Sequence, residues 1–278
     1  MPFLPLRTIP EPTARALGNE WIESLAASLA DASVDRAQLV RDTLTALYFP
    51  EFAKNWETAV EDDALPRATR LALAAMDPRA VTLEPEYYGD CDSEKFQRAK
   101  PLLWLWYSFD RSTAGAQNVW LGVELRRLLA KHIFKRVGEN FKAFHGVEFS
   151  FGYNMEVGDN VVVHRNVLLD DRGGIRLGNN VSISDYANIY SHTHSIVEQR
   201  DVTNAVTVID DGVRITYHAT VLAGVHVNEQ GMVGAMAVAT KDVRPYHVYV
   251  GIPAKSVRVK PNAPAPHHVL RTSSDRQA

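Results

Sequence analysis

The sequence has little of what would direct it to a special environment. Its 278 residues include a single cysteine, Cys91, so no internal disulfide can form, and one isolated thiol is no metal signature. Lysine and arginine are not clustered and the net charge is −3, which argues against nucleic acid or an anionic membrane as partner. No run of about 18 apolar residues occurs, and the N-terminus lacks the pattern of a signal peptide. We therefore expect a cytoplasmic globular protein with no membrane span.

The first half of the sequence has a helical period. From residue 13 to about residue 135, apolar residues recur at spacings of three and four, which predicts helices. The segment PLLWLWYSF (101–109) is apolar nearly all round, so we expect it to be buried, in ordinary core or against the second half or another subunit. The expected helices are Thr13 to Ala30, Val34 to Tyr48, Pro66 to Met76, Glu94 to Phe109 and Asn118 to Lys135.

The period changes after Lys135. The strings VGENF, VGDNV and LGNNV begin at residues 137, 157 and 177, so each follows the one before by 20 positions. Aliphatic residues also recur six apart, a spacing that fits a triangular coil with one aliphatic side chain from each short face on the axis. The sequence therefore predicts a parallel β-helix. Its inward residues would be Val157, Val163, Leu169, Leu177, Ile183, Ile189, Ile209, Ile215, Val221, Val227, Val233 and Ala239.

One interruption of the repeat carries two histidines. After Ile189 the segment SHTHSIVEQRDVTNAVTV is longer than the other coils need, and it begins with His192 and His194. An imidazole at the base of such a loop could act as a general base, which contributes about 100-fold to 10,000-fold in rate. The alternative is a loop histidine that binds nothing. For His192 we expect a structural role, or a role in setting the tautomer of its neighbour.

Residues 137–260 resemble the maltose and galactoside O-acetyltransferase branch of the hexapeptide-repeat acyltransferases. The matching strings are VGEN, FSFGYNMEVGDN, LDD, IYSHTHS, VTVIDDGVRI, VLAGV, VGAMAVATKDV and VGIPAKSV. The preceding helix, VELRRLLAKHIF, looks like the last helix of that family's small N-terminal domain, whereas the residues before it show no match. The two periods and the resemblance together predict an α+β chain: a helical N-terminal region (1–135), a left-handed parallel β-helix (136–260) and, because the last residues are Pro-rich and polar, a flexible C-terminal tail (261–278).

The resemblance also implies an activity. Members of this family transfer an acyl group, usually acetyl, from acetyl-CoA to a hydroxyl of a sugar or similar small acceptor, without a metal. They form homotrimers with the active sites between subunits. On this basis we expect an acyl-CoA-dependent O-acyltransferase that is a homotrimer, binds a small sugar-like acceptor and has no metal site.

The residues that match the family's motifs inherit expected roles. His194 falls on the catalytic base, and Asp171 is the best match to an acceptor-binding aspartate. The family's acceptor-pocket asparagine falls on His164, with Asn166 two residues further. Two departures, Arg214 and Tyr217 in place of a tryptophan and a serine, imply a different wall of the acceptor or pantetheine pocket. The residues expected to bind coenzyme A are Ala235, Thr240, Lys241, Lys255, Arg258 and Tyr217.

Three other functions compete with this interpretation. A γ-type carbonic anhydrase shares the β-helix, but it places two zinc-binding histidines five positions apart. The histidines of the repeats, His164, His192, His194, His218 and His226, contain no such pair. A non-catalytic scaffold would not need a histidine at the loop base together with the strings ATKD and GIPAKSVR. N-acylation of an amino sugar differs only in the nucleophile, and the sequence does not discriminate it.

Overall fold

The computed structural model describes residues 4–115, 117–198 and 200–265. The chain divides into two compact units, a helical unit over Leu6–Ile133 and a β unit that contains the residues from Phe134 onward together with Leu4 and Pro5. Of the C-terminal tail predicted over 261–278, residues 266–278 lie outside the described residues. Among the described residues, no helix is both long and apolar enough to cross a bilayer.

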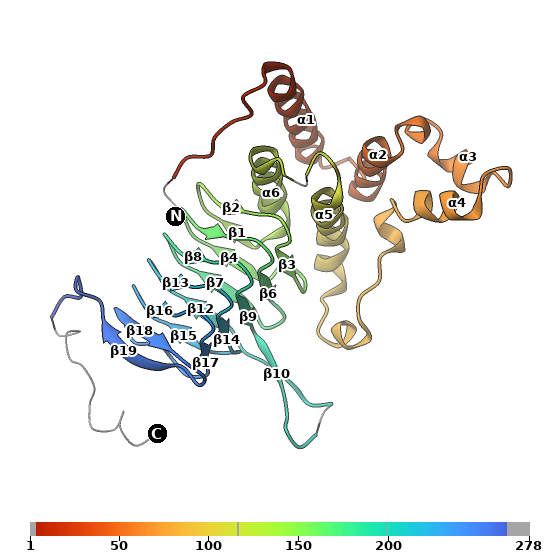
Figure 1. Cartoon of the computed structure of the whole chain (residues 1–278). Coiled ribbons are helices and arrows are strands. Elements are labelled where there is room, and N and C mark those ends of the chain that lie inside the picture. Colours follow the sequence, from red (N-terminus) through yellow and green to blue (C-terminus); the bar gives the residue numbers. More distant parts are fainter. Residues whose placement is uncertain (1–3, 116, 199, 266–278) are drawn as a thin grey trace. The chain divides into compact units, whose positions relative to one another are not determined.

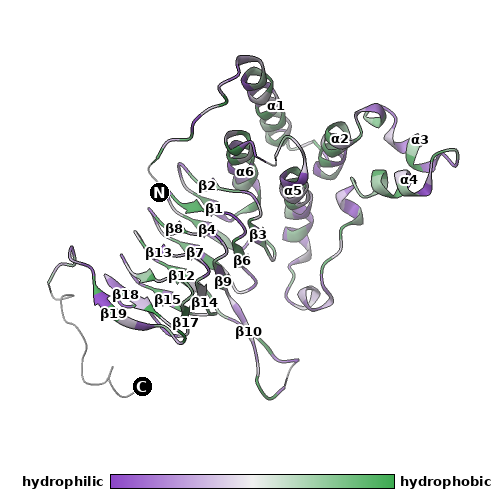
Figure 2. Ribbon diagram, viewed as in Figure 1, coloured by the Kyte–Doolittle hydropathy of each residue, from purple (hydrophilic) through white to green (hydrophobic). Residues whose placement is uncertain are grey.

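Three amphipathic helices of the helical unit begin at acidic caps. The side chains of Glu11, Asp35 and Asp92 accept backbone N–H groups at the starts of α1, α2 and α5, which satisfies donors that have no partner inside the helix. Hydrophilic and hydrophobic residues mix along each helix (Figure 2). The elements are α1 (Pro12–Ala30), α2 (Arg36–Tyr48), η1 (Pro50–Phe52), α3 (Trp56–Glu61), α4 (Arg67–Ala74), η2 (Pro78–Ala80), η3 (Pro85–Gly89), α5 (Ser93–Arg111) and α6 (Val119–Ile133).

Helix α5 forms the core of this unit. It contacts both α2 and α6, and Leu102, Trp106 and Phe109 are fully buried. Phe109 also stacks on Trp21 of α1, with ring centroids 5.5 Å apart. The apolar segment 101–109 is therefore core of its own unit. The predicted helices are confirmed to within a few residues at each end, whereas the short helix α3 was not predicted.

The β unit is a parallel β-helix whose short strands stack into three sheets (Figure 1). The first sheet contains β1 (Arg136–Val137), β4 (Met155–Val157), β7 (Ile175–Leu177), β12 (Thr207–Ile209) and β15 (His226–Val227). The second contains β2 (Lys142–Ala143), β5 (Val162–Val163), β8 (Ser182–Ile183), β13 (Arg214–Ile215), β16 (Met232–Val233), β18 (His247–Val250) and β19 (Lys255–Val259). The third contains β3 (Glu148–Phe149), β6 (Leu168–Asp170), β9 (Asn188–Tyr190), β14 (Thr220–Val221) and β17 (Val238–Ala239).

The axis of the β-helix is filled by the residues that the six-residue spacing predicts. Each of the twelve predicted inward aliphatic residues is at most 1% exposed. Neighbouring turns pair in register, so that Ile215 lies beside Ile183 on one side and Val233 on the other. The prediction of a β-helix with these inward residues is confirmed.

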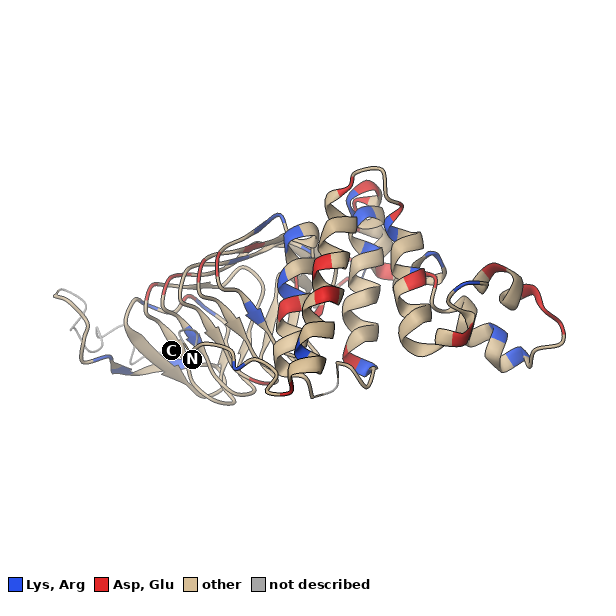
Figure 3. Ribbon diagram, turned by 90° about the horizontal axis from the view of Figure 1, so that it is seen from above, with Lys and Arg blue, Asp and Glu red and all other residues tan. Residues whose placement is uncertain are grey.

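The repeated Gly and Asn of the sequence form one corner of each of the first three turns. Asn140 and Asn160 both have φ 55°, and Asn180 has φ 59°, a left-handed conformation that asparagine tolerates better than most residues. The Asn140 amide donates to the Asn160 side chain at 2.9 Å. A Cβ on Gly158 would lie 2.7 Å from the backbone of Gly178 in the next turn. Acidic residues also recur on successive turns (Figure 3).

The interruption after Ile189 forms an antiparallel β-hairpin that projects from the stacked turns (Figure 1). Its strands are β10 (His192–His194) and β11 (Val202–Asn204). In the register of the hairpin, His192 lies opposite Asn204 and His194 lies opposite Val202. His192 is therefore the histidine nearer to the body of the β-helix, and His194 lies two residues further along the hairpin.

Candidate active site

A pocket of about 400 Å³ lies where the hairpin leaves the β-helix. The residues that line it follow or end three stacked strands of one sheet, β9, β14 and β17. Its volume falls within the usual range for small-molecule sites. The lining residues are Tyr190, His192, Thr193, His194, Leu222, Ala223 and Thr240.

Both hairpin histidines face this pocket. Side chains alternate along a strand, so residues two apart, such as His192 and His194, lie on the same face. Their rings meet edge to face with centroids 5.3 Å apart, and a ring nitrogen of each lies within 4.8 Å of a ring nitrogen of the other. His194 is exposed, whereas the side chain of His192 is 16% exposed. The pocket thus offers two imidazoles to one bound molecule.

His192 is held by a buried carboxylate. Its Nδ1 contacts Oδ2 of Asp170, and Asp170 is 2% exposed. The same carboxylate accepts the hydroxyl of Ser150 at 2.5 Å and the backbone N–H of Ser191 at 3.3 Å. Three groups on neighbouring turns therefore converge on one aspartate, and this network fixes the orientation of the His192 ring.

Asp171, expected to bind the acceptor, is fully buried in this chain. Its carboxylate accepts the backbone N–H groups of Phe151 at 2.8 Å and Asn154 at 3.0 Å. Burial raises the pKa of Asp171 to about 6, although these backbone donors oppose the shift. In the described chain its contacts tie one turn of the β-helix to the turn before it.

The other two expected acceptor-binding residues lie apart from the histidine pocket. His164 stacks on Phe144, with ring centroids 5.1 Å apart, and its burial lowers the pKa of the imidazole. Asn166 occupies a corner with φ 55°. Among the described residues, neither belongs to the lining of the pocket beside His194.

The residues expected to bind coenzyme A are spread over the last turns, and each is exposed. Thr240 lies in the pocket with His194, so the expected base and one expected coenzyme residue are brought together. Lys255 and Arg258 lie on β19, opposite Val250 and Val248 of β18. Ala235 and Lys241 are on the surface of the last turns.

Tyr217 contributes to an exposed aromatic cluster. It is 50% exposed and meets His218 edge to face at 4.2 Å between centroids. Tyr186, one turn earlier, is 43% exposed and stacks on His218 at 4.8 Å. Met236, one turn later, is 62% exposed. Tyr186, Tyr217 and Met236 thus form an exposed apolar patch over neighbouring turns of the β-helix.

Sequence reasoning did not assign the Asp170–His192 contact. No role was assigned from the sequence to Asp170, which ends strand β6. The repeat contains the signal that would have found the contact. Asp170 pairs with Tyr190 in the next turn. Tyr190 is two residues before His192, so the 20-residue register places Asp170 close to this histidine.

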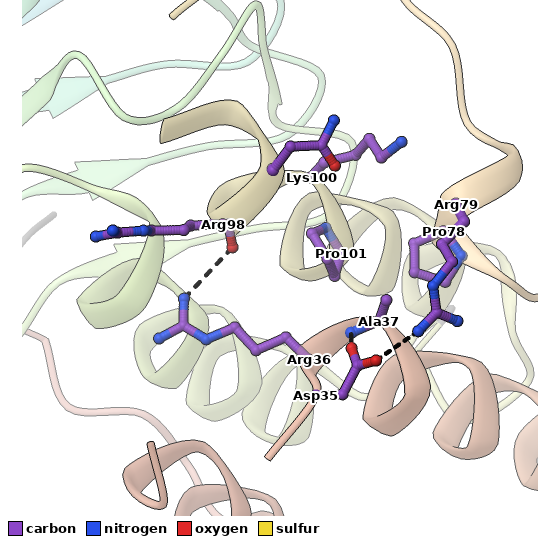
Figure 4. Close-up of a pocket in the computed structure, with 9 residues that line it drawn as sticks. Asp35, Arg36, Ala37, Pro78, Arg79, Arg98, Lys100 and Pro101 are labelled. Carbon is purple, nitrogen blue, oxygen red and sulfur yellow. Dashed lines mark hydrogen bonds and ion pairs between the residues drawn. The ribbon is translucent and has the colours of Figure 1, made fainter. Parts of the chain in front are cut away.

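A second pocket, of about 350 Å³, lies within the helical unit and is rich in basic residues. Several of its lining residues contact one another. Asp35 accepts the N–H of Ala37 at 2.8 Å and pairs with Arg79 at 2.5 Å, and Arg36 donates to the carbonyl of Arg98 at 3.4 Å (Figure 4). The side chains of Arg98 and Lys100 point in different directions (Figure 4). These contacts join α2, η2 and α5, which indicates a packing role.

Comparison with curated proteins finds acetyltransferases. The chain is 29% identical over 169 residues to the galactoside O-acetyltransferase of Escherichia coli (strain K12), which covers 59% of this chain and 79% of that protein. It is 31% identical over 137 residues to a protein of Staphylococcus aureus (strain MRSA252) provisionally named an acetyltransferase, which covers 48% of this chain and 69% of that protein. No protein-family model matches the sequence.

Comparison with solved structures gives the same fold. A galactoside acetyltransferase in complex with coenzyme A is 28% identical, with a TM-score of 0.53, over 61% of this chain and 83% of that one. A maltose O-acetyltransferase from Clostridium difficile 630 is 23% identical, with a TM-score of 0.53, over 60% of this chain and 87% of that one. At that identity the second likeness concerns the fold alone.

Proposed function

The chain belongs to the hexapeptide-repeat acyltransferase family, and from this premise we propose that it transfers an acetyl group from acetyl-CoA to a hydroxyl of a sugar-like acceptor, with His194 as general base. That it is an acetyl-CoA-dependent acyltransferase follows from its relatives. The acceptor, the base and the assembly are proposals. Membership in this family leaves no reason to retain a carbonic anhydrase or a passive scaffold.

The observation that carries the proposal is the pocket at the base of the hairpin. His194 and Thr240, which we expect to meet coenzyme A, both line this pocket, although they are 46 positions apart in the sequence. A general base must lie within hydrogen-bond reach of the proton that it takes and close to the thioester. A pocket shared by the expected base and an expected coenzyme residue meets this need.

The reaction requires no covalent enzyme intermediate. His194 takes the proton of the acceptor hydroxyl while the oxygen attacks the thioester carbonyl carbon, and a tetrahedral intermediate forms. The carbon–sulfur bond then breaks, and the imidazolium returns the proton to the leaving thiolate. The products are the acetyl ester and free coenzyme A. We propose that no metal takes part, because the imidazole supplies the only proton transfer that is needed.

Coenzyme A would lie along the exposed last turns of the β-helix. We propose that Lys241, Lys255 and Arg258 meet its phosphates, as cations should. Ala235 leaves room for the pantetheine arm beside the backbone, and Thr240 lies at the end of this track, in the pocket of His194.

We propose a homotrimer in which Tyr217 lies at a subunit interface beside the coenzyme cleft. The exposed apolar patch of Tyr186, Tyr217 and Met236 supports self-association. In a trimer, a neighbouring subunit can supply the second wall that a flat β-helix face lacks. His164 and Asn166 are exposed or half-buried in one chain and would meet the acceptor across such an interface. Asp171 is buried, so we propose that it acts on the acceptor indirectly, by supporting the turn that contacts the acceptor.

The protein would act in the cytoplasm, as its single cysteine and its use of acetyl-CoA both suggest.

The first test measures thiol release from acetyl-CoA against hexopyranosides, polyols and amino sugars, with wild-type protein and His194→Ala. We expect release that depends on a hydroxyl acceptor and falls at least 100-fold in the variant, with coenzyme A binding unchanged. Full activity of His194→Ala would refute the assignment of His194 as general base. Turnover with amino sugars alone would indicate N-acylation.

A further inference from the structure

The contact of the second pocket histidine with Asp170 selects one tautomer of its neutral ring. Its Nδ1 contacts the Asp170 carboxylate, which also accepts from the Ser150 hydroxyl and the Ser191 N–H. A carboxylate that accepts from these donors also accepts from the imidazole, so Nδ1 carries the proton of the neutral ring. The lone pair of His192 is then on Nε2, the nitrogen that Asp170 does not occupy.

The pocket can therefore present two imidazoles to one acceptor molecule. His194 must be unprotonated to act as a base, and one ring nitrogen of His192 lies within 4.8 Å of one ring nitrogen of His194. Hydrogen bonds to imidazole are about 2.8 Å long, so neighbouring oxygens of one small molecule can reach both nitrogens. A single alcohol has only one hydroxyl hydrogen and can satisfy only one of the two lone pairs.

We propose that His192, held by Asp170, is an acceptor-positioning residue that binds a second hydroxyl next to the one that His194 deprotonates. This inference rests on the proposed function and narrows it, because the acceptor then carries two hydroxyls on adjacent carbons. The bond to His192 leaves the reacting hydroxyl only a limited range of orientations toward His194. His192 takes no proton in the reaction, and the proton balance given for His194 is unchanged.

The experiment compares acceptors that differ by one hydroxyl. Rates are measured for the best hexopyranoside of the acceptor panel and for its monodeoxy derivatives at the carbons next to the acetylated one. For the wild type, removal of the bound hydroxyl should raise KM about tenfold, the value of one lost hydrogen bond to a built site. For His192→Phe, which keeps a ring without the lone pair, parent and deoxy acceptor should have the same KM. His192→Gln, which restores an acceptor oxygen, should recover part of the difference.

A second Asp–His pair on the same β-helix provides the control. His226 Nε2 and Asp210 Oδ2 are 2.7 Å apart, and neither residue belongs to the lining of the pocket. The variant His226→Phe should keep the wild-type preference for the parent acceptor. Asp170→Asn should behave like His192→Phe, because an amide can donate to Nδ1 and so move the ring proton to Nε2.

The outcomes separate this inference from the proposed function. If His194→Ala is inactive while His192→Phe discriminates parent from deoxy acceptors as the wild type does, the inference is wrong and the base stands. The inference also fails if the wild type uses every monodeoxy derivative as well as the parent, or if it acetylates only mono-alcohols. If His194→Ala keeps full activity, the proposed base is wrong whatever His192 does.

Discussion

The two units of the molecule are stabilised in different ways. In the β-helix, each turn repeats the same contacts with the turns on either side, through inward aliphatic residues and a ladder of side-chain and backbone hydrogen bonds. In the helical unit, the core depends on particular pairs. One of them is Arg126 of α6, which is 2% exposed and forms an ion pair with Asp110 of α5.

This difference predicts how each unit responds to mutation. A solenoid spreads its stability over similar neighbouring contacts, so one substitution should remove a small share of it. Loss of one partner of a buried ion pair should lower the stability by a large amount, because the remaining charge lies in a medium that solvates it poorly. The five tryptophans, Trp21, Trp56, Trp104, Trp106 and Trp120, all belong to the helical unit, so tryptophan fluorescence follows that unit alone.

The largest effect is expected for Asp110→Ala. Burial lowers the pKa of Arg126 and Asp110 opposes that shift, which shows that the aspartate stabilises the buried cation. Its removal should lower the free energy of unfolding of the helical unit by about 3–5 kcal/mol, measured by urea titration with tryptophan fluorescence. The double variant Asp110→Leu, Arg126→Met should recover most of this loss, since it removes both charges. A loss below about 1 kcal/mol for the single variant would contradict the prediction that this one ion pair contributes strongly to the stability of the helical unit.

The next effect is the dependence of the stability of the β-helix on the protonation of buried Asp171. The folded-state pKa of Asp171 is raised from 3.8 to about 6 by burial, so the folded chain binds a proton there that the unfolded chain releases. Stability from this group is therefore greatest below about pH 4 and is lost as the pH rises through 6, a change of about 3 kcal/mol. Asp171→Asn cannot titrate, so its destabilisation should be about 3 kcal/mol smaller at pH 7 than at pH 4. The measurement is urea unfolding by far-UV circular dichroism. A destabilisation that is constant across this range would refute the raised pKa.

A smaller effect is expected at the corner of a single turn. Asn160 has φ 55°, where most side chains cost about 1–2 kcal/mol and glycine costs nothing sterically. Asn160→Ala should therefore be about 1 kcal/mol less stable than Asn160→Gly. Both variants lose the hydrogen bond from Asn140, so their difference isolates the backbone conformation. Equal stability of the two variants would show that the turn adjusts its backbone.

The repeats explain why the β-helix could be predicted from the sequence in detail and the helical unit only in outline. A period of six, on each side of the hairpin, places Ile183, Ile215 and Val233 on the axis, and each of them is at most 1% exposed. The pairing of Arg126 with Asp110 spans 16 positions and depends on how α5 and α6 pack, which no period encodes. The contact between Asp170 and His192 could be predicted only in part. The register of the turns places Asp170 near the start of the hairpin, but the conformation of the hairpin decides which of the two histidines it contacts.

The smallest effect tests whether charge alone, without burial, has any weight in the helical unit. Arg98 and Glu94 of α5 form an ion pair at 2.6 Å, but their side chains are 72% and 80% exposed. An exposed pair four residues apart on a helix contributes about 0.3–0.5 kcal/mol, because water screens the charges and ordering two long side chains costs entropy. Glu94→Ala should therefore shift the urea midpoint of tryptophan fluorescence only slightly, and addition of salt to the wild type should reproduce the shift. A loss as large as that of Asp110→Ala would mean that geometry rather than burial sets the strength of ion pairs in this unit, and the contrast with the β-helix would then need another cause.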